Sequence, residues 1–217
     1  MNFLLSMVLL VVLSPYLEEN SPGDLGVTVV STYNVLATLY FIIHDRKNYF
    51  IWVFSFLIII AEWMHYLGLG DAQFGFFSTY ILLASKFGIT IIFGLALIKL
   101  FGIIFNTDEV DLNVIISSIS GYMAVGLMGA FGFDLLTAFF PTEFQISSGG
   151  ALDRHDMVYF SFITMSTLGY GDIVPTGPLA RGGAVLLTLT GQMYMTMVIA
   201  VLIGKFLASN RAKKKKS

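Results

Sequence analysis

Toward the C-terminal end of the chain lie six residues that could bind a dehydrated cation, Thr167-Leu168-Gly169-Tyr170-Gly171-Asp172. Such a site needs successive backbone carbonyls that point to one side, and this requires torsions that most residues avoid. Gly169 and Gly171 adopt these torsions at little steric cost. Rings of carbonyl oxygens then replace the water around an ion. We therefore expect this segment to bind cations, with the Thr167 hydroxyl as one more oxygen ligand.

The flanking sequence indicates how this segment is positioned. Met157–Ser166 is an apolar and hydroxyl-rich run suited to a short re-entrant helix, and Ala184–Leu207 is a long apolar stretch. Between them, Pro175 and Pro178 interrupt the chain. Non-helical backbone at membrane depth is tolerated only where protein buries it or water lines it. This setting favours the entrance of a pore over an ordinary glycine turn beside a membrane helix.

The composition indicates an integral membrane protein. Of the 217 residues, 56% are hydrophobic and only 12% are charged, and the mean hydropathy is +0.81. Soluble domains carry roughly a quarter charged residues. The formal net charge of -2 is uninformative as a total. The absence of cysteine excludes disulfides, thiolate metal sites and a cysteine nucleophile.

Apolar length predicts an all-α membrane protein with six spanning helices plus the re-entrant pore helix, since about 20 residues are needed for each span. The expected spans are Asn2–Leu17, Leu25–Ile43, Tyr49–Leu69, Phe74–Phe105, Asn113–Phe140 and Ala184–Leu207. We divide the chain into an N-terminal four-helix bundle (1–111), a pore domain (112–208) and a basic tail (209–217).

The loop charges predict the topology in a cell membrane. The basic stretches His44–Lys47 and Arg211–Lys216 lie on the cytoplasmic side by the positive-inside rule. Six spans then place both termini in the cytoplasm and Pro141–Asp156 outside, next to the cation-binding segment. The first apolar segment has an alternative interpretation as a cleaved signal peptide, which the lack of a preceding Lys or Arg disfavours.

From about Asn113 to Leu207 the chain resembles the pore module of the potassium-channel superfamily, and it looks most like the small prokaryotic channels. The residues that carry the resemblance are Tyr159-Phe160-Ser161-Phe162-Ile163-Thr164-Met165-Ser166-Thr167-Leu168-Gly169-Tyr170-Gly171-Asp172-Ile173-Val174-Pro175 and Gly191-Gln192-Met193-Tyr194. Two positions depart from the family. Leu168 stands where Val is common, and Ile163 stands where some relatives have a carboxylate behind the filter.

The resemblance implies a potassium-selective channel that needs no cofactor and is not an enzyme. The selectivity filter would be Thr167, Leu168, Gly169, Tyr170 and Gly171, with K+ bound at the first four, and Asp172, Thr164 and Tyr159 would support it. One filter segment per chain implies a homotetramer, since four strands must surround the ion. A weakly selective cation channel is the alternative, and a cation transporter is a more distant one; Tyr170 argues for potassium.

The inner apolar segment contains candidate pore-lining residues. Gly191 matches the family's hinge glycine, and four residues at helical spacing share one face that we expect to line the cavity and gate, namely Gln192, Met195, Ile199 and Ile203. Ordinary packing is the competing interpretation of this face.

The N-terminal bundle lacks the arginine array of voltage sensors. Its fourth segment offers only Lys86 and Lys99, so steep voltage gating is not expected. Lys86 and Glu62 both fall near mid-bilayer when helix rise is counted, and we expect them to form an ion pair, with His65 one turn away. This trio is interpreted as a structural staple, with a proton or ligand sensor as the alternative.

The remaining charges add less specific expectations. Asp134 is expected toward the outer end of the fifth segment, and a charged group precedes the pore helix, namely Asp153, Arg154, His155 and Asp156. The basic tail is interpreted as an anchor for anionic membrane lipid or as a topology signal. Scattered histidines make no acid-base or metal motif, and we expect no nucleic-acid partner. We also expect any ligand-sensing cytosolic domain to reside on a separate subunit.

Overall fold

The computed structural model describes residues 2–17, 25–43, 49–66, 75–107, 110–147, 149, 152 and 154–216. These ranges are mostly helical, with one small two-stranded sheet. In chain order the elements are α1 (Asn2–Leu17), α2 (Leu25–Ile43), α3 (Tyr49–Tyr66), α4 (Gly75–Asn106), α5 (Leu112–Phe139), the 3-10 turn η1 (Pro141–Glu143), β1 (Phe144–Ile146), α6 (Arg154–Met165), β2 (Ile173–Pro175) and α7 (Pro178–Lys216).

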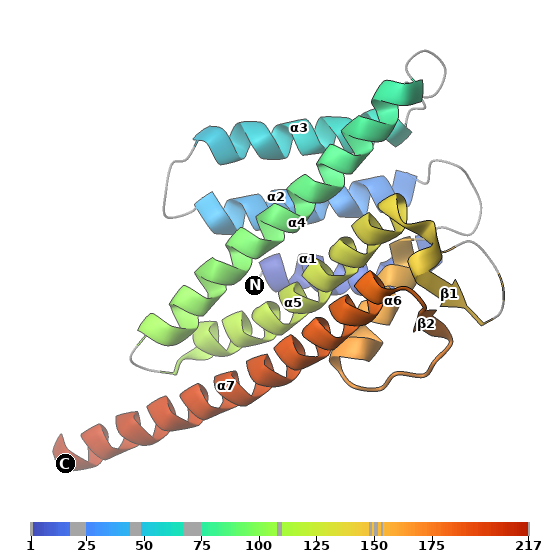
Figure 1. Ribbon diagram of the computed structural model, residues 1–217. Coiled ribbons are helices and arrows are strands. Elements are labelled where there is room, and N and C mark those ends of the chain that lie inside the picture. Colours follow the sequence, from blue (N-terminus) through green and yellow to red (C-terminus); the bar gives the residue numbers. More distant parts are fainter. Residues whose placement is uncertain are drawn as a thin grey trace.

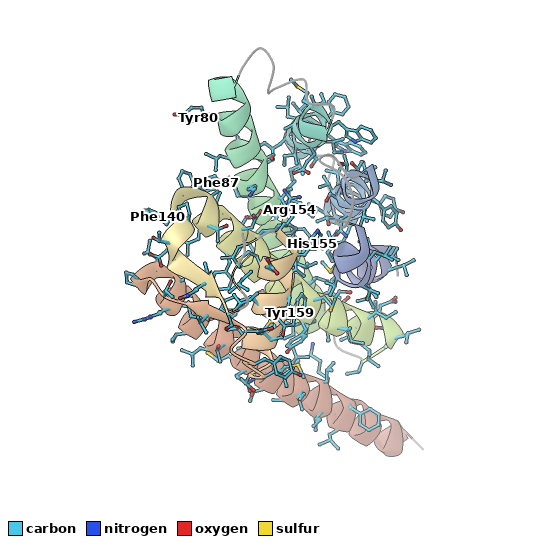
Figure 2. All side chains as sticks on the ribbon, turned by 90° about the vertical axis from the view of Figure 1, so that its right-hand side faces the viewer. Tyr80, Phe87, Phe140, Arg154, His155 and Tyr159 are labelled. Carbon is cyan, nitrogen blue, oxygen red and sulfur yellow. The ribbon has the colours of Figure 1, made fainter. Side chains whose placement is uncertain are left out.

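The helices alternate in direction (Figure 1). The helices α1, α3 and α5 run toward the end of the molecule that carries α6 and the two strands, whereas α2, α4 and α7 run away from it. Both chain ends therefore lie away from α6 and the strands. In the view toward this end, α1, α2 and α3 form one side of the molecule, and Arg154 and His155 lie between them and the side formed by α4, α5 and α7 (Figure 2).

Among the residues that the structure describes, three helical segments are long and apolar enough to cross a membrane, namely Leu83–Asn106, Leu112–Phe139 and Pro178–Ala208. The apolar parts of the first three helices are shorter, at Phe3–Leu13, Thr28–Ile42 and Ile51–Met64. The structure thus gives a mostly helical membrane protein with three candidate spans. The other three spans of the six stay a prediction.

Helix α7 differs from the expected inner segment at both ends. It begins at Pro178, six positions before Ala184, and continues as a helix through the basic residues to Lys216. Proline suits the first turn of a helix because its missing N–H has no partner there anyway. The buried Glu143 carboxylate accepts from the Ala180 N–H at 2.7 Å and completes this helix start. Side chains beyond residue 208 lie outside the description, so the predicted lipid contact of the tail does too.

Polar contacts bind the helices to one another at several levels. At the start of α5, the Asp111 side chain accepts from the Val114 N–H at 2.9 Å, which caps the helix. This hydrogen bond lowers the pKa of Asp111. Lys99 of α4 donates to the Phe41 carbonyl of α2 at 2.6 Å. Lys205 of α7 donates to the carbonyls of Ile104, Phe105 and Thr107, where the end of α4 leaves carbonyls without helical partners.

Candidate functional site

Helix α6 is held against α5 and β1 by aromatic packing and one buried hydrogen bond. Phe133 of α5, Phe144 of β1 and Phe160 of α6 pack edge to face, with ring centroids 5.3–5.4 Å apart. The Ser161 hydroxyl donates to the Gly126 carbonyl of α5 at 2.6 Å. Aromatic pairs of this geometry add to the stabilisation from area burial alone. The C-terminal end of α6 is therefore fixed relative to α5, and the filter segment follows directly from it.

The filter segment has alternating backbone torsions. The φ angles of Thr167, Gly169 and Gly171 are +65°, +51° and +80°, and the residues between them have negative φ. The N–H groups of Leu168 and Gly169 both donate to the Ile163 carbonyl, at 2.9 and 3.2 Å. A backbone whose φ alternates in sign turns successive carbonyls to the same side, as a row of oxygen ligands requires.

This row is accessible in the single chain. All residues from Thr167 to Asp172 are exposed, including 69% of Tyr170. Within the described part of the chain, the carbonyls of Leu168, Gly169 and Tyr170 accept no hydrogen bond. The segment therefore directs its donors into its own chain and leaves carbonyl oxygens available for a ligand. Carbonyl oxygens suit a hard cation that has lost its water.

The C-terminal end of the Thr167–Asp172 segment is bound to the segment before α6. Strands β1 and β2 pair antiparallel with Gln145 opposite Val174. Beyond the ladder, the Ser147 N–H donates to the Asp172 carbonyl at 2.8 Å, and its hydroxyl donates to the Gly171 carbonyl at 3.1 Å. Sequence reasoning missed Ser147 and Glu143, because each contacts residues more than 20 positions away and no local motif marks them.

Two predicted filter-support residues meet in the structure. The Tyr159 hydroxyl donates to Asp172 Oδ2 at 2.6 Å, and Oδ1 accepts from the Ile173 N–H at 3.1 Å. The hydrogen bond to the carboxylate raises the pKa of Tyr159 to about 12 and lowers the pKa of Asp172. Tyr159 therefore remains a donor over the physiological range. The third support residue, Thr164, accepts from the Thr167 N–H at 3.1 Å through its carbonyl.

Tyr159→Phe is expected to move the acid limb of the flux-against-pH profile to higher pH. Because the folded pKa of Asp172 is lowered, its contribution is present above the ordinary pKa and is lost as pH falls through the lowered value. Without the tyrosine hydroxyl, the pKa of Asp172 returns toward its ordinary value. Ion flux into liposomes at graded external pH measures this shift. Tyr33→Phe on α2 is the control, and superimposable profiles for all three proteins would contradict the prediction.

The predicted inner-helix residues separate into one buried and four exposed positions. Gly191 is buried, and a Cβ there would lie 2.3 Å from Met165 Cγ and 3.0 Å from the Met165 carbonyl oxygen. Glycine is thus needed at this position for close approach of α7 to α6. The others are exposed in the single chain, namely Gln192, Met195, Ile199 and Ile203. Their assignment to a cavity or gate stays a prediction.

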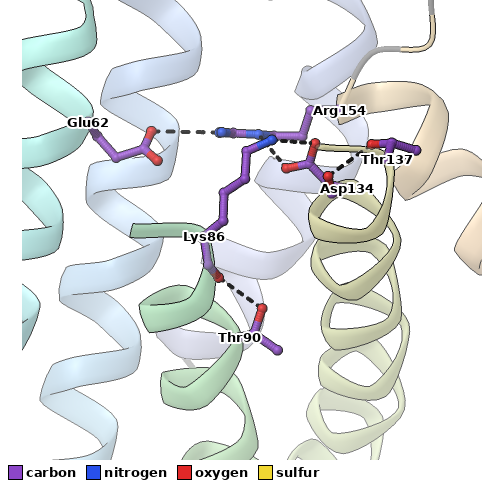
Figure 3. A network of polar contacts seen from close by, with 6 residues as sticks. All are labelled: Glu62, Lys86, Thr90, Asp134, Thr137 and Arg154. Atoms are coloured by element: carbon purple, nitrogen blue, oxygen red, sulfur yellow. Dashed lines mark hydrogen bonds and ion pairs between the residues drawn. The ribbon is translucent and has the colours of Figure 1, made fainter. Parts of the chain in front are cut away.

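The predicted ion pair between Glu62 and Lys86 is wrong in its partners. Lys86 Nζ lies 2.8 Å from Asp134 Oδ1, while Glu62 Oε2 lies 3.6 Å from Arg154 Nη1 (Figure 3). Arg154 Nε also lies 3.5 Å from Asp134 Oδ2. The physical reason is that α4 packs along α5, so that the nearest carboxylate to Lys86 belongs to α5. The side chain of His65 and all of Asp153 lie outside the described residues.

Comparison with known proteins agrees with this geometry. Residues 114–208 match the family model described as "Ion channel". This stretch contains nearly all of α5, the segment before α6, the filter and most of α7. Residues 114–208 are therefore an ion-channel domain of the potassium-channel superfamily, which confirms the resemblance stated from the filter motif.

A curated relative supports the potassium type. The chain is similar to "Putative potassium channel protein YugO" of Bacillus subtilis (strain 168), with 40% identity over 45 residues. The match covers 21% of this chain and 14% of the relative, so the chain spans only a small part of that protein's length. No solved structure matches the chain.

Proposed function

We propose that four copies of this chain form a potassium-selective channel in a cell membrane, with both termini in the cytoplasm and six spans per chain. The observation that carries the proposal is the filter segment, whose φ alternates in sign and whose Leu168, Gly169 and Tyr170 carbonyls accept no hydrogen bond within the described residues. One such strand lines one side of an ion. Four strands around an axis supply the oxygen rings that replace the hydration shell of K+.

The proposed conduction path continues from the filter along α7. Thr167 to Tyr170 bind K+ through carbonyl oxygens, and the Thr167 hydroxyl adds a ligand at the inner end. Below them Gln192 and Met195 line a cavity, and Ile199 and Ile203 form an apolar constriction that closes by dewetting. The exposure of these four α7 side chains in the single chain supports this assignment, since a tetramer axis would use such a face.

The proposed channel is not steeply voltage gated. The two lysines of α4 are both engaged, Lys86 with Asp134 and Lys99 with the Phe41 carbonyl. A lysine paired with a carboxylate moves no net charge when the two groups move together. Since each elementary charge moved across the field contributes roughly 2.3 kcal/mol per 100 mV, little energy is available here to open a pore.

Purified protein in liposomes is expected to carry K+ down its gradient, to exclude Na+ by at least about tenfold, and to be blocked by Ba2+, because carbonyl rings favour the larger ion. The measurement is radioactive rubidium or fluorescence-detected K+ flux, with empty liposomes as the control. Equal K+ and Na+ flux with barium block would favour the weakly selective cation channel. Absence of any barium-sensitive flux would refute the channel proposal.

A further inference from the structure

Four charged side chains from four helices form a connected chain of ion pairs at the boundary between the N-terminal bundle and the pore. In order they are Glu62 of α3, Arg154 of α6, Asp134 of α5 and Lys86 of α4 (Figure 3). The side chains of Glu62 and Asp134 are 10% and 8% exposed, and those of Arg154 and Lys86 are 23% and 19% exposed. The charges alternate in sign and cancel, so the group is suited to a weakly hydrated site.

Arg154 occupies a helix position that opposes its charge. It is the first residue of α6, where the helix dipole is positive and a cation is unfavourable. Two carboxylates from different helices offset this cost, and the same dipole attracts both of them. The stability and the apolar packing of α6 do not explain an arginine at this position. The contacts of Arg154 with Glu62 and Asp134 explain it.

Glu62 is attached to the chain of ion pairs through one oxygen. Oε2 faces Arg154 at 3.6 Å, whereas Oε1 is buried and has no hydrogen-bond partner among the described residues. A buried carboxylate with one unsatisfied oxygen is held in place mainly by its cation. The contact between α3 and α6 is therefore a single ion pair of 3.6 Å, and movement of α3 would break or tighten it.

Helix α6 connects this group of charges to the filter over a short distance. Arg154 begins the helix, and the helix is 12 residues long, which corresponds to about 18 Å at 1.5 Å per residue. Near its other end, the Ile163 carbonyl accepts from the N–H groups of Leu168 and Gly169. A displacement of Arg154 is thus transmitted through a rigid element to the peptide groups of the filter.

We propose that Arg154 is a positioning residue for the selectivity filter and that Glu62 of α3 is its control point in the N-terminal bundle. The proposal rests on the proposed channel function. It assigns the bundle a role that does not involve voltage. Movement of α3 relative to α5 changes the position of Arg154. Through α6 it also changes the order of the filter, so that the N-terminal bundle regulates the channel at its filter.

A double-mutant cycle tests the pair. Glu62→Gln and Arg154→Gln are each expected to lower the K+ over Na+ flux ratio about fivefold and to speed barium release, the size of an ordinary coupling between sites. The double variant is expected to change the ratio no more than the larger single variant, because both remove the same contact. Additive effects, or unchanged ratios in both single variants, would overturn the proposal.

Lys99→Met is the matched control, since it removes another lysine of α4 that donates to the Phe41 and Ile42 carbonyls of α2. It is expected to leave selectivity and barium release unchanged, and an equal loss of selectivity there would overturn the specific role of Arg154. Glu62→Asp keeps the charge but moves the carboxylate farther from Arg154, so an intermediate flux ratio is expected. This variant tests the proposal even if the neutral variants fail to assemble. A wild-type ratio for this variant in that case would also overturn the proposal.

The same liposomes separate the two proposals. A wild-type protein without potassium-selective flux would end the proposed function. If the wild-type protein is selective and the Glu62 and Arg154 variants have the same K+ over Na+ flux ratio, the proposed channel function is retained. Only the proposed coupling of Glu62 and Arg154 to the filter is then refuted. Chromatographic assembly state and thermal stability of every variant accompany the flux measurements, because a purely structural effect lowers stability without a change in selectivity.

Discussion

Gly169→Ala is expected to reduce K+ flux by at least about 100-fold in a channel that still assembles. The φ angle of Gly169 is +51°, and holding alanine there costs about 1–2 kcal/mol per chain. With four strands around one ion path, the cost rises to about 4–8 kcal/mol, which corresponds to several powers of ten in a rate. The strand relieves it by rotating a peptide group, so that a carbonyl leaves the ion path. Flux into liposomes measures the loss.

The expected loss arises from torsion rather than from collision. A Cβ built at Gly169 meets no atom within 4 Å in the single chain, so alanine does not displace a neighbour. Gly132 of α5 is the matched control, because its Cβ also meets nothing within 4 Å and its φ is helical. Gly132→Ala is expected to conduct normally. Equal flux in the two variants would contradict the torsional argument.

Asp134→Leu is expected to lower the free energy of unfolding by about 3 kcal/mol per chain, since it leaves the half-buried Lys86 without its ion-pair partner. Asp134 contacts both cations of the ion-pair chain, at 2.8 Å from Lys86 and 3.5 Å from Arg154. Arg154 retains Glu62, whereas Lys86 loses its ion-pair partner. Denaturant titration in detergent micelles, followed by the helical circular dichroism signal, measures the difference.

The double variant Lys86→Met with Asp134→Leu is the control. Replacing both members of a buried pair with apolar side chains of similar volume is often nearly neutral, whereas removing one member is costly. We therefore expect the double variant to recover most of the stability. A double variant as unstable as Asp134→Leu alone would show that Asp134 contributes through something other than its pair with Lys86.

Apolar run length predicted the ends of α1 and α2, where a polar residue follows each run. Helices α1 and α2 begin and end at the predicted residues. Helix α7 was predicted too short, because Pro178 was interpreted as a break although proline favours a first helical turn. Its helical start also depends on Glu143, which lies 37 positions from Ala180, and such a contact leaves no trace in a single sequence.

The filter was predictable to a greater extent than the charge contacts. Glycine is the residue that most readily adopts a positive φ, so the positive φ of Gly169 and Gly171 could be predicted from residue types alone. The ion-pair partner of Lys86 could not be predicted in this way. Helix rise predicts similar depths for Glu62 and Lys86 and so suggests a pair, but it says nothing about which neighbouring helix each side chain faces. Asp134 takes the place of Glu62 beside Lys86, and Arg154 takes the place of Lys86 beside Glu62.

Contacts at two levels of α4 limit how that helix can move. Lys86 holds it to α5, and the carbonyls of Ile104 and Phe105 near its C-terminal end hold it to Lys205 of α7. Sliding by one helical turn, about 5.4 Å, would separate both contacts at once. A swing about the line that joins the two anchors keeps both. Helix α4 can therefore turn about this line without losing either contact, whereas Lys99 ties it to α2 and the Glu62–Arg154 ion pair ties α3 to α6.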